Sequence, residues 1–564
     1  MFQRLVLIGS FTVLLVPCGA LLAQGNYASV TGIVTDALGA SVPKAAVTIR
    51  NVDTGVDRTI HTSESGDFTI TNLPPGPYEV SAEMAGFRKY RRVGIVLEIG
   101  QVLRSDIQLE LGQVSESISV TAQAAALNTE NGAIQGDVIS RQEIMELPLD
   151  ERDFTDLAFL APGVLPAASG GEGSFAAING ARADSTNFYV DGFSNRNARD
   201  ASPQVRPNLG AMQEFKMETS GYSAEMGRMA GGVMNMVLRS GTNRYHGDVF
   251  EYIRNNVIDA RGFFDPEKLG LHRNQYGATF EGPVRLPRLY DGRNRSFFMF
   301  SWESYKQNIG QTSITRVPSL LERNLDFSKS FSLTSGAAIT LKDPLNGNAQ
   351  FPGNRIPASR LDPVAAKLMA YYPQPNRGDP RNNFIAVANV PDTWDSFVVK
   401  ADHRFNEKNT LTYRAQVRFN HTTAPFTGSA MGGFPNLSND KRSLMGIDYI
   451  HLFTATVLVE VHSGFSRNNT YANGFMAGQD MYAALGMPSV ALDPNVMGWP
   501  RFTVTDYAPI GSAANQPNEH HVTDIQNSAK FTWAKSRHVM KWGFERSNVR
   551  INQPYYNNSI SIAR

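Results

Sequence analysis

Two pairs of residues in this sequence are of types that could bind a metal ion. His61 and Glu64 have the His-x-x-Glu spacing of a zinc-ligand pair, and His520 is followed directly by His521. A catalytic zinc needs a third protein ligand and an open coordination position. The first pair lies on a predicted hairpin, and the two histidines lie on a predicted polar loop. We therefore interpret both pairs as structural, and we predict neither a metal site nor a cofactor.

Two further patterns could indicate phosphate binding or acid catalysis. Residues 171–176 loosely fit the Gly-x-Gly-x-x-Gly/Ala pattern, but no strand precedes them and no convincing helix follows, so we expect a loop. Asp191 precedes Gly192, which favours a turn over a catalytic acid. The sequence contains no nucleophile elbow, P-loop or paired-carboxylate constellation. It therefore predicts that the chain is not an enzyme.

The best functional candidate is a short polar strand within a linker, residues 112–127, that is rich in Ser, Ala and Gln. A flexible strand of this kind can add to the sheet edge of a partner and transmit force through main-chain hydrogen bonds. A plain linker strand is the alternative. The candidate residues are Glu116, Ser117, Ile118, Ser119, Val120 and Thr121.

The chain begins with the pattern of a secretory signal peptide, predicted over residues 1–23. Arg4 is followed by an apolar stretch too short to span a bilayer, and then by small residues up to Ala23. Cys18 is the only cysteine, and Pro17 before it disfavours a lipoprotein signal. The mature chain would therefore have no thiol for a disulfide, a metal site or a nucleophile.

Charge and hydropathy narrow the class of protein. The chain has 53 basic and 52 acidic residues, a net charge of +1, and no long run of either sign. This pattern indicates neither a nucleic acid nor an anionic lipid as partner. No apolar stretch of about 18 residues follows the signal, which argues against a transmembrane helix. An exported chain of this kind is either soluble or an outer-membrane barrel.

Residues 27–111 predict a small β-sandwich. Apolar residues alternate along short segments such as Tyr78, Val80 and Ala82, and turn clusters separate the segments. The order of Thr31-Gly32-Ile33-Val34-Thr35-Asp36, Gly66-Asp67-Phe68 and Leu73-Pro74-Pro75-Gly76-Pro77-Tyr78 resembles the carboxypeptidase regulatory-like domain. The resemblance implies a transthyretin-like, carbohydrate-binding-like fold that is more often a spacer or interaction module than a glycan site.

Residues 128–240 predict a small mixed α/β unit. Ser140 and Glu143 have capping-box spacing, so a short helix is expected towards Leu147. A second amphipathic helix is expected over residues 154–160, ending at Pro162. Strand-like segments follow around residues 188–190, 214–217 and 232–237.

This unit is similar to the plug of TonB-dependent outer-membrane receptors of the Oar-like type. The similarity is carried by Leu160-Ala161-Pro162-Gly163-Val164, Ile178-Asn179-Gly180-Ala181-Arg182, Asn187-Phe188-Tyr189-Val190-Asp191-Gly192 and Tyr222-Ser223-Ala224-Glu225-Met226-Gly227-Arg228. It implies that residues 116–121 are the TonB box. The plug motif that it implies comprises Asn179, Gly180, Arg182, Asp191, Gly192, Glu225, Gly227 and Arg228.

Residues 245–564 predict about nine long amphipathic strands of an antiparallel transmembrane barrel. Leu411, Tyr413, Ala415, Val417 and Phe419 alternate with Thr410, Thr412, Arg414, Gln416 and Arg418, as a lipid-facing strand with a wet lumen requires. Phe298, Phe300 and Trp302, with Tyr305 nearby, suit an aromatic girdle. Residues 307–394 are expected to form a long extracellular loop.

The sequence thus predicts a mainly β protein of the cell outer membrane, with the sandwich and plug on the periplasmic side. The family resemblance implies uptake of a bulky ligand, such as a glycan or metal chelate, driven through the TonB complex of the inner membrane. An adhesion or secretion protein on the same scaffold, or a soluble exported carbohydrate-binding protein, are the alternatives. Since barrels of this kind have about 22 strands, we expect the chain to be the N-terminal part of a longer barrel.

Overall fold

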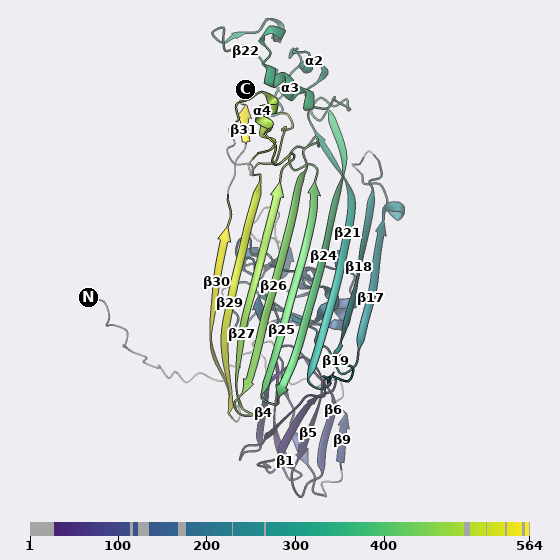
Figure 1. The fold of residues 1–564 in the computed structure, drawn as a ribbon, viewed down its shortest axis with the longest axis vertical. Helices are drawn as coiled ribbons and strands as arrows, with labels where there is room; N and C mark the ends of the chain where they lie inside the picture. Colours follow the sequence, from purple (N-terminus) through teal and green to yellow (C-terminus); the bar gives the residue numbers. More distant parts are fainter. Residues whose placement is uncertain are drawn as a thin grey trace, which may run out of the picture.

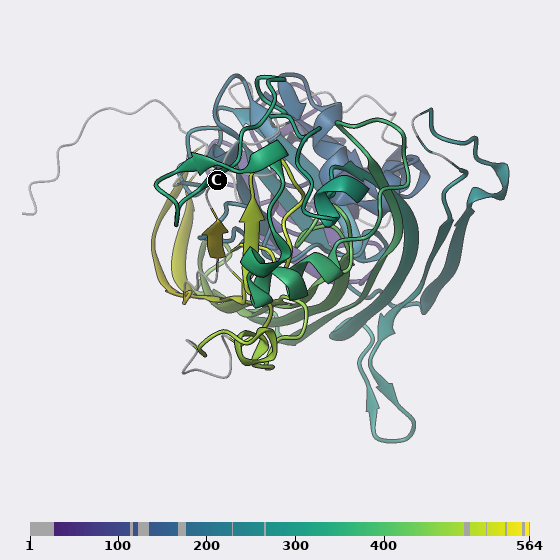
Figure 2. The same cartoon turned by 90° about the horizontal axis from the view of Figure 1, so that it is seen from above.

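The computed structural model describes residues 27–562 apart from 113–116, 122–134, 167–175, 228, 264, 266, 490–496, 515, 536–537 and 555–558. The predicted signal peptide, Glu116, Arg228 and most of the glycine pattern at 171–176 lie outside the described residues. Figure 1 shows a sandwich at one end of the long axis, a tall sheet in the middle and folded loops at the other end. Figure 2 shows that the tall sheet curves around an inner unit.

The sandwich is built from two sheets, with strand orders β4-β1-β7 (β8 also pairs with β1) and β3-β2-β5-β6-β9, in which β9 is Ser117–Thr121. Its first eight strands are β1 (Ala28–Asp36), β2 (Ala46–Asn51), β3 (Asp57–His61), β4 (Asp67–Leu73), β5 (Gly76–Glu83), β6 (Lys89–Leu97), β7 (Val102–Arg104) and β8 (Ile107–Leu109). The predicted alternation is confirmed, since Tyr78, Val80 and Ala82 are all buried in the core between the sheets.

The inner unit, residues 135–240, is a five-stranded mixed sheet of order β10-β15-β16-β13-β14, with short helices beside it. Its buried core also contains Met299 and Val398 of the tall sheet, so the two parts pack together directly. The elements are β10 (Gln135–Ser140), α1 (Arg141–Glu146), η1 (Asp150–Arg152), η2 (Phe154–Leu160), β11 (Val164–Pro166), β12 (Ala176–Ile178), η3 (Ala183–Ser185), β13 (Asn187–Val190), β14 (Phe193–Ser194), η4 (Leu209–Ala211), β15 (Met212–Ser220) and β16 (Val233–Leu238).

The two predicted helices of the inner unit differ in outcome. Ser140 is the N-cap of helix α1 and forms the predicted capping box with Glu143, and the helix ends before Pro148. The second segment is a 3₁₀ helix, η2, and not an α-helix. Side chains three residues apart eclipse one another in the tighter turn. This geometry places Phe154 and Leu157 together in the core, whereas Leu160, the last residue of η2, is exposed.

The tall sheet, here called the wall, has nine antiparallel strands in consecutive order, as predicted. The strands are β17 (His246–Asn255), β18 (Leu271–Pro283), β21 (Ser296–Thr315), β24 (Phe384–Asn406), β25 (Asn409–Ala424), β26 (Asn436–Leu452), β27 (Val457–Asn473), β29 (Asn518–Lys535) and β30 (His538–Asn552). The alternation is confirmed: Thr412, Arg414 and Gln416 are buried on the inner face, and Tyr413 and Phe419 are exposed on the outer face.

Two expectations about the wall need correction. Tyr305 does not join the aromatic girdle. It lies an odd number of residues after Trp302 in β21, so its side chain is on the opposite face of the strand. There it is fully buried and stacks on Trp394. The long loop is shorter than expected, since β21 and β24 continue to Thr315 and from Phe384. Among the described residues, no helix is both long enough and apolar enough to cross a bilayer.

The loops at the far end of the wall fold into a cap with its own apolar core, which includes Val317, Leu368, Phe434 and Trp499. Figure 1 shows these segments stacked above the strands. Their elements are α2 (Leu320–Arg323), β22 (Lys342–Asp343), β23 (Ala349–Gln350), η6 (Pro352–Asn354), η7 (Ala358–Arg360), α3 (Pro363–Tyr371), α4 (Met481–Leu485), β28 (Arg501–Val504) and β31 (Ser559–Ile562). The connection between β17 and β18 contains η5 (Asn256–Ile258), and the connection between β18 and β21 contains β19 (Arg285–Leu286) and β20 (Tyr290–Asp291).

Candidate functional site: contacts of the inner unit

The hairpin between β13 and β14 carries the best-defined contact between the inner unit and the wall. Asp191 and Gly192 form its two-residue turn, with φ of 47° and 86°. Positive φ at both central residues is the geometry for which Asn, Asp and Gly are preferred in tight hairpins. The local sequence therefore sets the turn, and the turn projects Asp191 and Phe193 towards the wall.

The Asp191 carboxylate is buried between two cations of the wall. Its Oδ2 lies 3.1 Å from Lys400 Nζ and 3.5 Å from Arg414 Nε, and its Oδ1 accepts a hydrogen bond from the Leu238 amide at 2.9 Å. All three charged side chains are at most 9% exposed. A buried carboxylate needs this degree of pairing to remain charged.

The charge network continues along the inner face of the wall. Arg414 also pairs with Asp448, and Asp448 pairs with His462. His462 Nε2 then lies 2.5 Å from Glu460 Oε1. The hairpin turn is therefore one end of a chain of buried ionisable groups.

Phe193 fits into a gap that two wall glycines leave open. A Cβ atom at Gly446 would lie 2.4 Å from the Phe193 ring, and one at Gly464 would lie 2.3 Å from it. The ring also packs edge-on to His462, with centroids 5.6 Å apart, and beneath the guanidinium of Arg414. The phenylalanine is thus enclosed on several sides.

A second contact holds the hairpin and the segment before β16 to the last two wall strands. Gln526 accepts from the Ser194 amide at 2.9 Å and donates to its carbonyl at 2.8 Å. Glu225 lies 3.0 Å from Lys541 Nζ and 3.5 Å from Lys530 Nζ. Two of the predicted motif residues, Asp191 and Glu225, therefore pair with cations of the wall.

The other predicted motif residues shape the inner unit itself. Asn179 and Gly180 form a turn with positive φ after β12, and Asn179 donates to the Thr219 carbonyl at 3.0 Å. Arg182 is exposed and pairs with Asp184. The Gly227 carbonyl accepts from Asn187. In the part of the chain that the structure describes, these residues do not gather with Asp191 and Glu225 in a single pocket.

Sequence reasoning missed the wall side of this contact. Lys400, Arg414, Lys530 and Lys541 lie more than 170 positions beyond the inner unit residues that they pair with, and no motif marks them. The signal available in the sequence was the inward phase of the strand pattern, which places Arg414 on the polar face. This alternation predicts that Arg414 faces the lumen or a buried contact, but it does not identify the residue with which Arg414 pairs.

The sandwich joins the inner unit through a buried carboxyl group. Glu214 of β15 is 5% exposed, and its Oε2 accepts a hydrogen bond from the Ile99 amide at 2.7 Å. Burial raises the pKa of the Glu214 carboxyl to about 8, although the Ile99 hydrogen bond acts in the opposite direction. Because the protonated form is the one that burial favours, this junction is sensitive to pH.

We expect this contact to weaken as pH rises from about 4.5 to about 8. The Glu214 carboxyl binds its proton more tightly in the folded state than in the unfolded state. The free energy of unfolding therefore falls with rising pH over the range in which only the folded state is protonated. Glu214→Gln retains an acceptor for Ile99 without a charge and should abolish this slope. The measurement is the hydrogen-exchange protection factor of the Ile99 amide across that pH range, with Glu79→Gln, at the exposed pair with Arg91, as control. An unchanged slope in Glu214→Gln would contradict the assignment.

A cavity of about 450 Å³ separates the sandwich from the wall and the base of the inner unit. Its lining includes Tyr78 of the sandwich, Arg239 of the inner unit and Arg404 of the wall. Among the described residues, a hydrogen bond from Arg404 to the Asp57 carbonyl joins the wall to the sandwich, and one from the Asn243 amide, just before the wall, reaches the Asp53 carbonyl. The sandwich therefore contacts the inner unit and the wall around this cavity.

The predicted functional strand lies at the edge of the sandwich. β9 (Ser117–Thr121) pairs in parallel with β6, with Lys89 opposite Ser117 and Val93 opposite Thr121. Its other side has no neighbour in the described sheet. A strand in this position presents free main-chain donors and acceptors to an incoming strand.

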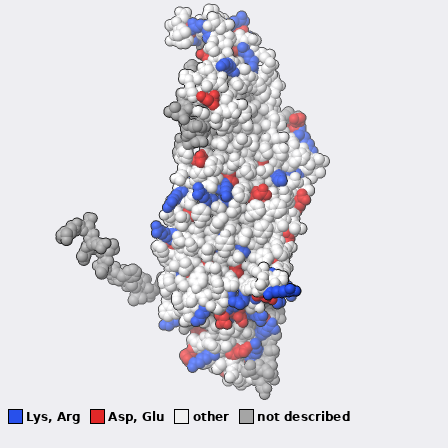
Figure 3. Space-filling view, in the orientation of Figure 1, with Lys and Arg blue, Asp and Glu red and all other residues white. Residues whose placement is uncertain are grey.

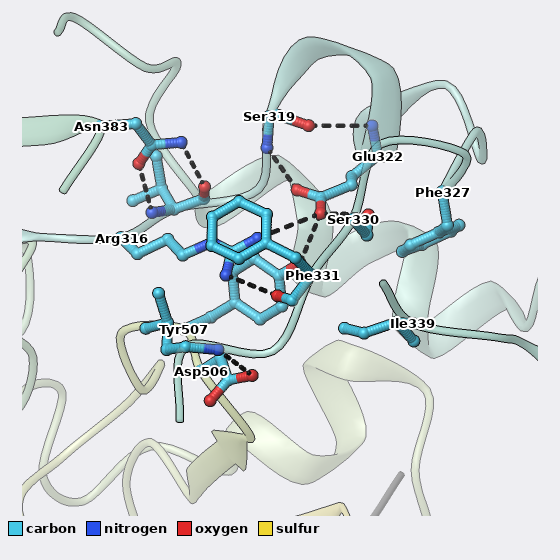
Figure 4. A network of polar contacts seen from close by, with 12 residues as sticks. Arg316, Ser319, Glu322, Phe327, Ser330, Phe331, Ile339, Asn383, Asp506 and Tyr507 are labelled. Carbon is cyan, nitrogen blue, oxygen red and sulfur yellow. Dashed lines mark hydrogen bonds and ion pairs between the residues drawn. The ribbon is translucent and has the colours of Figure 1, made fainter. Parts of the chain in front are cut away.

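The cap contains a buried ion pair between Arg316 and Glu322, and both side chains also contact Tyr507, a residue distant in the sequence (Figure 4). The Arg316 guanidinium lies between the rings of Phe331 and Tyr507, at 4.7 and 4.9 Å from their centroids. The Glu322 carboxylate accepts from the Tyr507 hydroxyl at 2.7 Å, from Ser330 and from the Ser319 amide. Since both charged groups are at most 5% exposed, the cap is a folded unit with a defined shape.

The candidate metal ligands do not form a site. His61 ends β3 and Glu64 lies in the following turn, and no group of three potential ligands occurs among the described residues. The prediction that His520 and His521 lie on a loop is wrong. Both belong to β29, whose alternation buries His520 and turns His521 towards Asn469 and Glu519.

Comparison with known proteins defines the class. The outer membrane beta barrel domain family matches residues 237–562, and the carboxypeptidase regulatory-like domain family matches residues 29–110. Since the first match covers more than half of the chain, the protein belongs to the outer-membrane β-barrel family and is located in the outer membrane. It is similar to the TonB-dependent transporter Oar of Myxococcus xanthus, with 27% identity over 301 residues. That match covers 50% of this chain and 28% of the relative.

The solved structures that the chain matches include the following three. The outer membrane transporter YddB of Escherichia coli has a TM-score of 0.45 at 11% identity, over 75% of this chain and 48% of its own. A mutant of the ferric enterobactin receptor PfeA of Pseudomonas aeruginosa has a TM-score of 0.42 at 12% identity, over 74% and 49%. The alcaligin receptor FauA of Bordetella pertussis has a TM-score of 0.39 at 10% identity, over 76% and 57%. The chain therefore spans about half the length of these structures.

Proposed function

We propose that this protein is a TonB-dependent receptor that imports a bulky ligand across the outer membrane. In this proposal the inner unit is the plug, the wall is part of the barrel, and the sandwich faces the periplasm. The observation that carries the proposal is the position of the inner unit. It lies against the inner face of the wall and is held there by a buried ion pair at Asp191 and a partly buried one at Glu225. A body in this position blocks a lumen until it is moved.

The proposed energy input is a pull on residues 116–121 by the TonB complex of the inner membrane. β9 occupies an edge of the sandwich sheet and has one free side. A partner strand could add to that side or take the place of β6, and main-chain hydrogen bonds would then carry the force. The relative from Myxococcus xanthus is itself named a TonB-dependent transporter, which supports this partner.

The cap is the proposed site of first contact with the ligand, which would be a glycan, a metal chelate or another bulky solute. The cap lies at the end of the wall opposite the sandwich (Figure 1). Its folded core and the Arg316–Glu322 pair give it a fixed surface, as a recognition site requires. The family assignment sets aside the alternative of a soluble exported carbohydrate-binding protein.

A crosslinking experiment tests the coupling without knowledge of the cargo. A photoreactive amino acid at Ser119 should capture TonB in living cells, whereas one at Thr59, on the opposite edge strand β3, should not. Ile118→Pro removes a main-chain donor and should reduce the yield about tenfold, the equivalent of ~1.4 kcal/mol or roughly one hydrogen bond. Equal capture at both positions, or none at Ser119, would refute the coupling.

The same strand separates import from the adhesion or secretion alternative. A protein that uses this scaffold passively should keep its surface function when residues 116–121 are deleted. A transporter should lose uptake both in this deletion and in cells that lack TonB.

A further inference from the structure

The connection between β18 and β21 departs from a tight turn and forms a projecting hairpin, residues 284–295. Arg285 and Leu286 of β19 pair with Asp291 and Tyr290 of β20. Figure 1 places the hairpin at the sandwich end of the wall, and Figure 2 shows it reaching outward, away from the curved sheet. In a membrane-embedded barrel, a segment that points outward at this level meets the lipid surface.

The base of the hairpin is fixed to the wall. The Val284 amide donates to the Ser296 carbonyl at 2.8 Å, and the Gly292 amide donates to the Val284 carbonyl at 2.9 Å. The Tyr290 hydroxyl lies 2.5 Å from Ser296 Oγ. These contacts hold the tip at a set distance from the strands.

The tip combines exposed leucines with arginines. Leu286 is 53% exposed and Leu289 is 85% exposed. Residues 284–295 contain four arginines and one aspartate, a local charge of +3 in a chain whose net charge is +1. Asp291 is engaged by Arg293 at 2.6 Å and more loosely by Arg285 at 3.8 Å, and Arg288 has no ion pair among the described residues. Figure 3 shows basic side chains standing out from the wall at this level.

We propose that this hairpin binds anionic phospholipid in the periplasmic leaflet of the outer membrane. Leu286 and Leu289 enter the acyl region, and the arginines bind the headgroup phosphates. Apolar side chains flanked by basic ones are the pattern of segments that lie in a membrane interface. Arginine matches phosphate oxygens in geometry and charge. The choice of leaflet rests on the orientation proposed above, whereas lipid binding itself does not.

A site-specific probe tests this proposal on the whole chain in lipid nanodiscs. Because Cys18 is the only cysteine, Leu289→Cys in a Cys18→Ser background gives a single site for an environment-sensitive fluorophore. Leu345→Cys, in the cap and 81% exposed, is the matched control. The label at 289 should emit at shorter wavelength and be quenched several-fold more by spin-labelled lipid than the label at 345.

The requirement for anionic lipid is tested by changing the phospholipid composition of the nanodiscs. Quenching at position 289 should rise when phosphatidylglycerol replaces part of the phosphatidylethanolamine, and Arg285→Gln with Arg288→Gln should remove that rise. Water-like emission at both positions would overturn membrane insertion. Quenching that does not change with phosphatidylglycerol content would overturn the assignment to anionic lipid. Neither result depends on ligand uptake, so failure here is distinguishable from failure of the transport proposal.

Discussion

Asp191→Asn should loosen the inner unit from the wall by about 3–5 kcal/mol, the usual cost of removing one partner from a buried ion pair. Asparagine tolerates the positive φ of the turn and keeps an acceptor for the Leu238 amide. The substitution therefore changes the charge and leaves the backbone in place. Lys400 would remain buried with only the Leu238 carbonyl, 2.9 Å away, as partner. Hydrogen exchange of β13 and β14 in detergent micelles measures the loss.

The matched control for this experiment is Asp184→Asn. Asp184 lies in the same unit and pairs with Arg182, but that arginine is 73% exposed. Exposed pairs contribute roughly 0–1 kcal/mol, so exchange in β13 should hardly change. Lys400→Met combined with Asp191→Asn should cost less than the sum of the two single changes, because both charges are then removed together. Equal exchange in Asp191→Asn and Asp184→Asn would contradict the proposed contact.

Gly464→Ala should also displace the hairpin, with an expected loss of about 1–3 kcal/mol from overpacking. The added Cβ atom would lie 2.3 Å from the Phe193 ring. The ring cannot move aside freely, because Arg414 and His462 contact it on other sides. The expected result is faster proteolysis of the inner unit in the intact protein, measured as the half-life of the full-length band.

Phe193→Ala provides the background in which Gly464→Ala should no longer destabilise the protein. Alone it removes a buried aromatic ring and should cost about 3–5 kcal/mol. In that background the further change Gly464→Ala should have almost no effect, since the atom it would meet is gone. Gly270→Ala is the neutral control, because a Cβ atom there has nothing within 4 Å. If Gly464→Ala were equally harmful with and without Phe193, steric contact with this ring would not be the cause.

Much of this protein follows from local patterns in the sequence. The period-two alternation along residues 410–419 predicts which side chains face inward, since successive side chains of a strand point to opposite faces. Ser140 and Glu143 predict the start of α1, because both groups satisfy backbone amides within the same turn. Asp191-Gly192 predicts a turn, because these residues tolerate positive φ. Each of these preferences depends on the nearest few residues.

Other features were settled only when distant parts of the chain came together. The sequence predicts a turn at Asp191, but its pairing with Lys400 and Arg414 arises from the docking of the inner unit against the wall. The raised pKa of Glu214 arises from burial at a junction with residue 99. Tyr305, grouped by sequence with an outward girdle, turns inward because the strand register fixes its side. Burial and long-range pairing depend on which surfaces meet, and local preferences do not determine that.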